Sequence, residues 1–157
     1  MRFLSILFMM VFSNILFANT LATKDYVAID SANQKAILFY VNKHRASKGL
    51  RPLKLNNVMS SAATIHSRDM ARHSIPFGHK HFDKRIKRLY GKIKNCQAGS
   101  ENVAYNYKDG QDVVKNWLTS RLHRRNIEGN FNLTGIGLAR DSRGKLYFTQ
   151  IFLRTKN

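Results

Sequence analysis

Residues 98–107 have the sequence Ala-Gly-Ser-Glu-Asn-Val-Ala-Tyr-Asn-Tyr, which predicts a β-strand. Val103, Tyr105 and Tyr107 alternate with smaller or amide-bearing side chains, and strand geometry sends the two sets to opposite faces. Glu101 is the one charge in this stretch. A carboxylate that a strand carries into the interior is costly to bury unless it meets a cation, a hydrogen-bond donor or a metal ion. The stretch therefore predicts a strand of the fold and a point where polar chemistry is expected.

The residues before this strand are predicted to be helical. Apolar side chains recur at spacings of three and four over residues 25–47 and again over residues 57–73. Gly49 supplies a left-handed cap for the first helix, and Asn56 is placed to cap the second. A third, short helix is expected in the basic segment 80–94, where three apolar residues share one side: Phe82, Ile86 and Leu89.

The residues after the strand predict more helix and then a hairpin. Helical segments are expected from Asp109 or Gly110 to Ser120 and over 122–127, and strands over 134–140 and 145–154. The turn sequence Asp141-Ser142-Arg143-Gly144 is typical of a connection between antiparallel neighbours. Helices come first, and strands then follow with a helical region between them. This order predicts an α+β layered domain rather than a βαβ repeat.

The composition bounds the class of protein. The chain has 157 residues, enough for one globular core and too few for two ordinary domains. Its 27 Lys and Arg against 9 Asp and Glu give a net charge of +18, which predicts attraction to anionic partners. A single cysteine, Cys96, excludes an internal disulfide and a multi-cysteine zinc ribbon. Basic residues around Cys96 can lower the pKa of its thiol, which leaves a reactive thiol or an intermolecular disulfide as the alternative to the favoured interpretation, an incidental free cysteine.

The first 22 residues predict a secretory signal peptide. Arg2 precedes an apolar run over residues 3–16, and small residues offer cleavage after Ala22 or after Ala18. The competing interpretation is an uncleaved anchor, but the run is shorter than the roughly 20 apolar residues of a spanning helix and holds polar interruptions. We therefore expect the peptide to be removed. Residues 23–157 would then form a single, monomeric domain, secreted or periplasmic, with no transmembrane segment.

A series of short blocks follows along the chain, and their order is far more specific than any one of them. The blocks are Asn42-x-x-Arg45, Gly49-Leu50-x-Pro52-Leu53, Ala62-Ala63-x-x-His66-Ser67-x-Asp69-Met70, Phe77-Gly78-His79, Glu101-Asn102-Val103-Ala104, Trp117-x-x-Ser120-x-x-His123-Arg124-x-Asn126-Ile127, Thr134-Gly135-Ile136-Gly137-Leu138 and Phe148-Thr149-Gln150-x-Phe152. The pattern resembles the CAP superfamily of SCP-like domains, which includes cysteine-rich secretory proteins, insect venom antigen 5 and plant pathogenesis-related proteins. The similarity covers residues 35–153 and is greatest to the disulfide-free bacterial branch. It implies a three-layer α-β-α sandwich with an antiparallel central sheet and a cleft lined by two histidines and two glutamates.

The resemblance also implies which residues line that cleft. His79 corresponds to the first histidine, Glu101 to the glutamate of the family's Gly-Glu-Asn segment, and His123 to the second histidine. Ser120 stands where the family has its other glutamate, so the set is incomplete. Two further residues are expected at the cleft from their place in the pattern: His66 in the second helix and Gln150 in the last strand.

These side chains suit metal or acid–base chemistry. Two neutral imidazoles, His79 and His123, can bind a divalent ion such as zinc or magnesium and leave positions open for water. Glu101 would then be the general base. In a variant, Ser120 is the nucleophile and His123 its base, although a serine near a helix end usually caps the helix. Two histidines near the His79 loop are the alternative ligands: His73 and His81.

The incomplete set favours a binding module over an enzyme. The expected ligands are a lipid or sterol, an anionic polymer of an envelope or host surface, or a protein partner, with no cofactor required. The basic segment 80–94 is the candidate surface, unless it is a solvated face whose apolar residues simply pack on the core. The alternative function is a metal-dependent or acid–base hydrolase that uses Glu101 with His79 and His123. Specific nucleic-acid binding is not expected, because basic charge alone gives nonspecific affinity for phosphates and no nucleic-acid module is visible.

Overall fold

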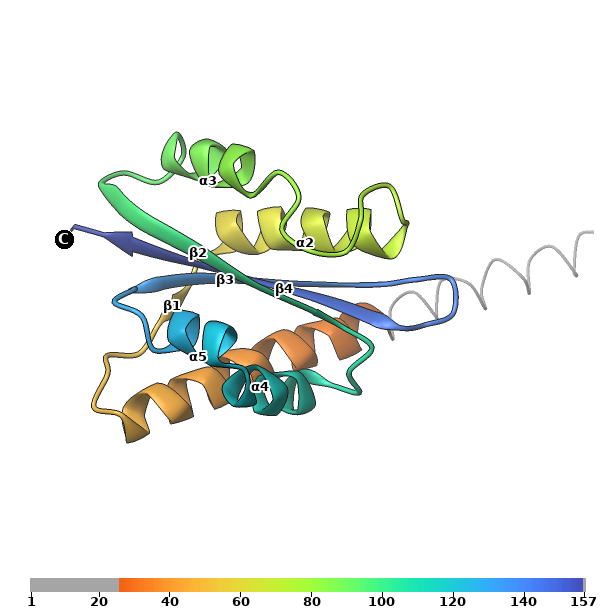
Figure 1. The fold of residues 1–157 in the computed structure, drawn as a ribbon, viewed down its shortest axis with the longest axis horizontal. Coiled ribbons are helices and arrows are strands. Elements are labelled where there is room, and N and C mark those ends of the chain that lie inside the picture. The colour runs from red at the N-terminus through yellow and green to blue at the C-terminus, as the bar shows by residue number, and fades with distance from the viewer. Residues whose placement is uncertain (1–25, 157) are drawn as a thin grey trace, which may run out of the picture. The chain divides into compact units, whose positions relative to one another are not determined.

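A computed structural model of the protein describes residues 26–156 (Figure 1). The predicted signal peptide lies outside the described residues. The chain divides into two compact units at the boundary between Ala32 and Asn33. In the first unit, residues 26–32 are helical. The second unit begins with a helix over residues 33–47.

A four-stranded sheet forms the middle layer of this unit (Figure 1). Its strands are β1 (Lys54–Leu55), β2 (Cys96–Tyr105), β3 (Leu133–Arg140) and β4 (Leu146–Thr155). They lie in the order β1-β3-β4-β2, so β2 is an edge strand with β4 as its neighbour. Both long pairings, β2 with β4 and β3 with β4, are antiparallel, as the family resemblance implied for the central sheet. The turn at residues 141–144 predicted the second of these pairings.

The short strand β1 was not predicted and pairs in parallel with β3. The Lys54 amide donates to the Asn132 carbonyl, and the Asn56 amide donates to the Thr134 carbonyl. Two residues are too short to show an alternating pattern, which is why the sequence does not reveal this strand. The sheet is therefore antiparallel through its long strands and parallel at this edge.

Helices cover both faces of the sheet, which confirms the predicted three-layer arrangement (Figure 1). One layer contains α2 (Asn57–Ala71) and α3 (Phe82–Tyr90). The other contains the helix over 33–47, α4 (Gly110–Thr119) and α5 (Arg121–Ile127). The larger core lies on the α4 and α5 side and includes Trp117 and Phe148, whereas the smaller one lies under α2 and α3 and includes Met59 and Ile151.

The caps that the sequence predicted are present. The side chain of Asn56 accepts a hydrogen bond from the Met59 amide at 3.0 Å, and this fixes the start of α2. Asp109 caps α4 in the same way. Gly49 has a φ of 69°, the left-handed conformation expected after the first helix.

Two glycines of β3 allow α2 to approach the sheet closely. A Cβ atom on Gly137 would lie 2.0 Å from the backbone nitrogen of Thr64, and one on Gly135 would lie 2.3 Å from the Cβ of Met59. Neither distance is tolerable for a real side chain, so both positions require glycine. The close contact carries the buried middle of α2, including His66, down onto the strands.

A buried arginine joins the first helix to the segment after α5. Arg45 donates to the carbonyl groups of Arg51, Ile127 and Gly129 at distances of 2.7 to 2.9 Å, and to that of Phe131 at 3.2 Å. Burial lowers the pKa of this guanidinium. The four carbonyl partners compensate for the loss of water around the charge and hold the end of α5 in place.

Candidate functional site

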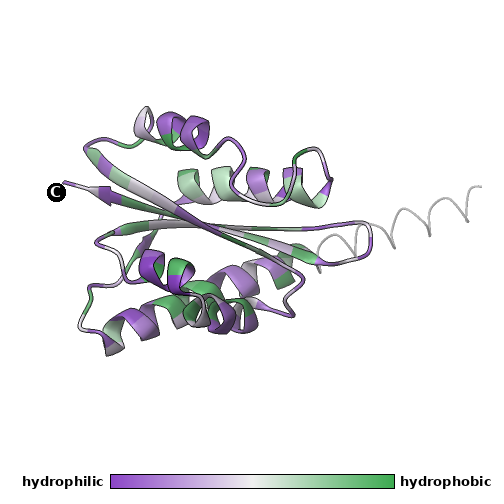
Figure 2. Ribbon diagram, in the orientation of Figure 1, coloured by the Kyte–Doolittle hydropathy of each residue, from purple (hydrophilic) through white to green (hydrophobic). Residues whose placement is uncertain are grey.

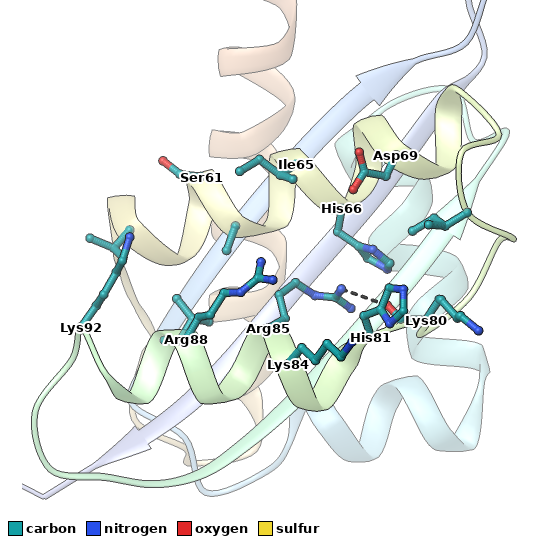
Figure 3. A pocket seen from close by; sticks show the side chains of 14 residues that line it. Ser61, Ile65, His66, Asp69, Lys80, His81, Lys84, Arg85, Arg88 and Lys92 are labelled. Atoms are coloured by element: carbon teal, nitrogen blue, oxygen red, sulfur yellow. Dashed lines mark hydrogen bonds between the residues drawn. The ribbon is translucent and has the colours of Figure 1, made fainter.

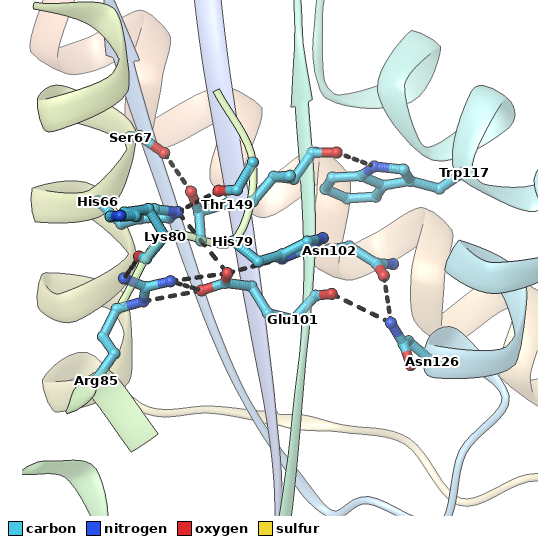
Figure 4. A network of polar contacts seen from close by, with 12 residues as sticks. His66, Ser67, His79, Lys80, Arg85, Glu101, Asn102, Trp117, Asn126 and Thr149 are labelled. Carbon is cyan, nitrogen blue, oxygen red and sulfur yellow. Dashed lines mark hydrogen bonds and ion pairs between the residues drawn. The ribbon is translucent and has the colours of Figure 1, made fainter. Parts of the chain in front are cut away.

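The Glu101 side chain is at the centre of a polar network on the face of the sheet that α2 and α3 cover (Figure 4). Only 1% of this side chain is exposed. Arg85 of α3 donates from Nε to Oε2 at 2.9 Å and from Nη2 to Oε1 at 2.8 Å. Such a two-point contact between a guanidinium and a carboxylate is both strong and directional. The network therefore supplies the cation that a buried carboxylate requires.

His79 makes the next contact with this carboxylate. Its Nδ1 donates to Glu101 Oε1 at 3.0 Å, while 52% of the His79 side chain remains exposed. The preceding Gly78 has a φ of 133°, which only glycine adopts readily, and this turn directs His79 back toward the sheet. The ring is thus anchored at one nitrogen and open to solvent along half of its surface.

His66 supports the His79 loop from α2. Its Nε2 donates to the carbonyl oxygen of Gly78 at 2.8 Å and lies 3.7 Å from Glu101 Oε1. Burial lowers the pKa of His66 and outweighs the opposing effect of the Glu101 charge, with Arg85 adding to the lowering. The ring is therefore neutral at pH 7, with Nδ1 as an acceptor that has no hydrogen-bond partner among the described residues. We call Glu101, Arg85, His79 and His66 the Glu101 network.

His123 is held from the opposite face of the sheet. Asn102, next to Glu101 on β2, donates from Nδ2 to the His123 carbonyl at 3.1 Å. Asn126 donates from Nδ2 to Asn102 Oδ1 at 2.8 Å and to the Glu101 carbonyl at 3.1 Å. Burial lowers the pKa of the His123 imidazole, and the electrostatic interaction with His79 lowers it further. The two predicted histidines thus interact electrostatically, although they belong to different layers.

The predicted metal ligands, His79 and His123, are not part of a larger cluster of ligating side chains among the described residues. Within residues 26–156, no group of three or more His, Cys, Asp or Glu side chains is arranged to hold an ion. Both oxygens of Glu101 already accept hydrogen bonds from Arg85, and His79 uses Nδ1 on the same carboxylate. His79 and His123 therefore lack the third side-chain ligand that a catalytic zinc ion requires, so this donor set does not fit zinc.

Ser120 lies at the junction of α4 and α5. Its carbonyl accepts from the Arg124 amide at 2.9 Å, and its side chain makes no capping hydrogen bond. Among the contacts of the described chain, none joins the Ser120 hydroxyl to His123. The nucleophile–base pair of the serine hypothesis is therefore not assembled in this conformation.

Gln150 lies deep in the sheet, within the middle layer. It is fully buried, and its Nε2 donates to Thr134 Oγ1 at 3.1 Å. The strand register places it opposite Asn102 on one side and Ile136 on the other. No hydrogen bond links Gln150 to the Glu101 network in the part of the chain that the structure describes. The structure thus brings His66, His79 and Glu101 into one set of contacts and leaves Ser120 and Gln150 outside it.

Arg85 is the residue that sequence reasoning missed. The cost of burying Glu101 pointed to a cation, but seven lysines and arginines lie between residues 80 and 94, and spacing alone did not single out one of them. Cys96 does not follow the alternative of an activated thiol. Burial raises the pKa of the Cys96 thiol, which donates to the Ile93 carbonyl at 3.1 Å, so nearby cations do not activate it.

Comparisons with known proteins agree with this fold. The model of the cysteine-rich secretory protein family matches residues 38–152. Two Bacillus subtilis proteins of unknown function are similar in sequence. YkwD is 34% identical over 78% of this chain and 48% of its own length, and the membrane protein YlbC is 31% identical over 80% and 36%. The chain thus spans between one third and one half of the length of these relatives.

A solved structure is also similar in fold. An extracellular, SCP-domain protein from Bacillus anthracis superposes with a TM-score of 0.67 at 28% identity, over 81% of this chain and 42% of that one. None of the helices in residues 26–156 is both long and apolar enough to cross a lipid bilayer.

Proposed function

Because the chain belongs to the cysteine-rich secretory protein family, also called the CAP superfamily, we propose that it is an extracellular-type binding module for anionic ligands. The observation that supports this most is the pairing of Glu101 with Arg85. The pairing uses the carboxylate to join two elements of the fold, so the residue best suited to be a general base is occupied. The module reaches its compartment through the signal peptide predicted over residues 1–22.

The geometry of Glu101 argues against hydrolysis. A general base needs a carboxylate within hydrogen-bond reach of a substrate proton or of the attacking water. Here the carboxylate is almost fully buried and accepts from Arg85 and His79. Moving it toward a substrate would break a buried ion pair, which is strongly unfavourable.

The charge of the protein indicates the class of ligand. The net charge of +18 gives long-range attraction to anionic lipids, surface polymers and acidic protein segments. The exposed lysines and arginines of segment 80–94 concentrate that charge beside the Glu101 network. Of the ligand classes that the sequence allowed, this surface suits those that carry negative charge and gives no basis for a neutral sterol.

One observation favours the hydrolase as a second candidate. His79 is half exposed, and Glu101 orients it through Nδ1. This arrangement leaves Nε2 as the nitrogen that can exchange a proton with solvent, as in a base that a carboxylate holds in one tautomer. In this version His79 is the acid–base residue and Glu101 positions it.

Binding and turnover measurements separate the two functions. The protein is titrated with vesicles of phosphatidylglycerol and phosphatidylcholine, with pure phosphatidylcholine vesicles and with polyglutamate, at about 0.15 M salt. We expect binding to the anionic probes alone, and we expect Glu101→Gln to keep that affinity while it lowers the melting temperature. Absence of binding to every anionic probe would refute the binding function. Hydrolysis of an ester, peptide or glycoside substrate that His79→Ala abolishes would establish the second candidate.

A further inference from the structure

A groove of about 550 Å³ lies between α2 and α3, and His66 and Arg85 of the Glu101 network form part of its lining (Figure 3). Side chains of α2 form one wall and side chains of the segment that contains α3 form the other. The two walls differ in chemistry, as Figure 2 shows in the contrast between the hydrophilic α3 and the more apolar α2. The α2 wall includes Val58, Ala62 and Ile65. The opposite wall includes Lys84, Arg88 and Lys92.

The α2 wall is an apolar stripe in which Ala62 packs against the core under α2 and α3, whereas Val58 and Ile65 belong to none of the core clusters in residues 26–156. Val58, Ala62 and Ile65 follow one another at helical spacing, so they share one side of α2. Val58 is 41% exposed and Ile65 is 54% exposed. Apolar side chains in a row on a helix, open to solvent beside a second helix, are typical of a surface that binds another amphipathic element.

The opposite wall is a row of cations. Lys84, Arg88 and Lys92 recur every fourth residue, and none of the ion pairs in residues 26–156 involves them. Arg85 also lines the groove, but its charge is already paired with Glu101. Lys84 and Arg88 lie on α3, and Lys92 follows just beyond the end of that helix. Like charges four residues apart, as in Lys84 and Arg88, destabilise a helix, and a bound anion would remove that repulsion. Asp69 is the one carboxylate among the groove residues, and it comes from α2.

We propose that this groove binds an acidic amphipathic helix of a protein partner, an inference that rests on the proposed binding function. A helix rises about 6 Å over four residues, so acidic side chains at every fourth position of the partner match the cation row of this chain. Leucine-like side chains on the adjacent side of the partner cover Val58 and Ile65. Charge and apolar surface are thus both complementary along the whole groove.

The layout of the groove disfavours other anionic occupants. A lipid with a single head group carries its charge at one end, whereas the cations follow the length of the groove. A polyanion without apolar groups leaves Val58 and Ile65 uncovered. A second copy of this chain brings the same excess of positive charge. A helix segment as long as the row from Lys84 to Lys92 occupies roughly 1,250 Å³, which is more than the volume of the groove. The groove therefore takes the side chains of one face of the partner helix, while the partner's backbone stays outside.

A designed peptide tests the proposal. The probe is a labelled helical peptide with Glu at every fourth position on one side and Leu at positions i, i+4 and i+7 on the adjacent side. Its control has the same composition in scrambled order. Fluorescence anisotropy with the full chain measures both affinities at about 0.15 M salt. We expect the patterned peptide to bind more tightly than the scrambled one, by about tenfold or more.

Matched variants locate the site. The groove variant is Lys84→Glu, Arg88→Glu and Lys92→Glu together, and its charge-matched control changes three exposed lysines elsewhere: Lys35, Lys43 and Lys115. We expect the groove variant to lose about tenfold or more in affinity and the control to lose about twofold or less. Ile65→Ser should also weaken binding, whereas Leu122→Ser, at an exposed leucine of α5, should not.

The outcomes separate the groove from general charge attraction. Equal losses in the groove and control variants would overturn the groove assignment, yet the anionic binding function would stand. If polyglutamate, anionic vesicles and the peptide all fail to bind, both the groove assignment and the anionic binding function are refuted. A third outcome is that the peptide fails to bind while sodium oleate binds and loses affinity in the groove variant. That result would overturn the proposal that the ligand is a protein helix. Circular dichroism of each variant confirms that its fold is intact.

Discussion

Glu101 and Asn102 are adjacent on β2, and each fastens a different layer of helices to this edge strand. Successive side chains of a strand point to opposite faces. Glu101 accepts from Arg85 of α3 and from His79 on one face, whereas Asn102 donates to the His123 carbonyl of α5 on the other. Two neighbouring residues therefore set where both predicted histidines lie, and they do so through independent contacts.

Removal of one partner of the buried ion pair is expected to cost more than removal of both. Arg85→Met leaves the Glu101 carboxylate buried without its cation, which should lower the free energy of unfolding by about 3–5 kcal/mol. The double change Arg85→Met and Glu101→Gln should lower it by less, because no uncompensated charge remains. Urea denaturation of the four proteins in this cycle measures the difference. A double variant that is less stable than Arg85→Met would contradict the role of the pair.

Loss of the Asn102 side chain is expected to loosen only the α5 side. Asn102→Ala removes the hydrogen bonds to His123 and Asn126, at a cost of about 1–3 kcal/mol for the buried groups left unpaired. Hydrogen exchange should therefore accelerate in α5 and leave α3 unchanged. Arg85→Met is the matched comparison, since it should accelerate exchange in α3 instead. Equal acceleration of both helices in either variant would show that the two contacts are coupled.

The buried histidine should make stability fall below neutral pH. The pKa of His66 is lowered in the folded state, so the unfolded chain binds the extra proton first. Its contribution is fully present above the unfolded pKa of about 6.5 and is lost as the pH falls through that value toward the folded pKa. His123 acts in the same direction. Unfolding measured between pH 7.5 and 5 should show this loss, with a smaller slope in His66→Gln; an unchanged slope would exclude His66.

A methyl group on Gly137 should push α2 away from the sheet. Its Cβ would meet backbone atoms of Ala63 and Thr64 that cannot move aside, so Gly137→Ala should destabilise the fold by about 1–3 kcal/mol or more. Gly91→Ala is the control, because the nearest atom to its Cβ would be 3.6 Å away. Thermal melting of the two variants compares them directly. Equal melting temperatures would show that β3 and α2 can separate without cost.

Zinc is expected not to bind at His79 and His123 with defined stoichiometry. The two imidazoles lack a third ligand among the described residues, and Glu101 is engaged by Arg85. Calorimetric titration of the protein should therefore give the same weak heat as the variant with His79→Ala and His123→Ala. A sharp one-to-one transition that this double variant loses would show that the site rearranges to bind metal.

Most of the architecture could be predicted from short-range signals. The alternation of apolar residues in β2, the cap at Asn56 and the turn at residues 141–144 each act within a few positions, and each was identified. Strand β1 was not identified, because its two residues owe their conformation to pairing with β3, far along the chain.

Less of the candidate site than of the fold could be predicted, because its contacts also join residues that are far apart in the sequence. The family pattern pointed to Glu101 and His79, which the structure joins by a hydrogen bond. The identity of the cation beside Glu101 depends on how α3 rotates over the sheet, and only the packing of Ile86 and Leu89 settles that rotation. The sequence left a reactive Cys96 thiol open as an alternative, because local sequence shows nearby charge but does not show burial.

The central position of β4 has a consequence for the order in which the chain folds. This strand is the last element of the sequence, yet it pairs with both β2 and β3, and without it β2 has no neighbour in the sheet. Two hydrogen bonds of Arg45 likewise depend on carbonyl groups that lie more than eighty positions later in the chain. High contact order of this kind delays folding until the final residues are available. A chain without β4 should therefore be unable to complete the sheet, because β2 then lacks its neighbour.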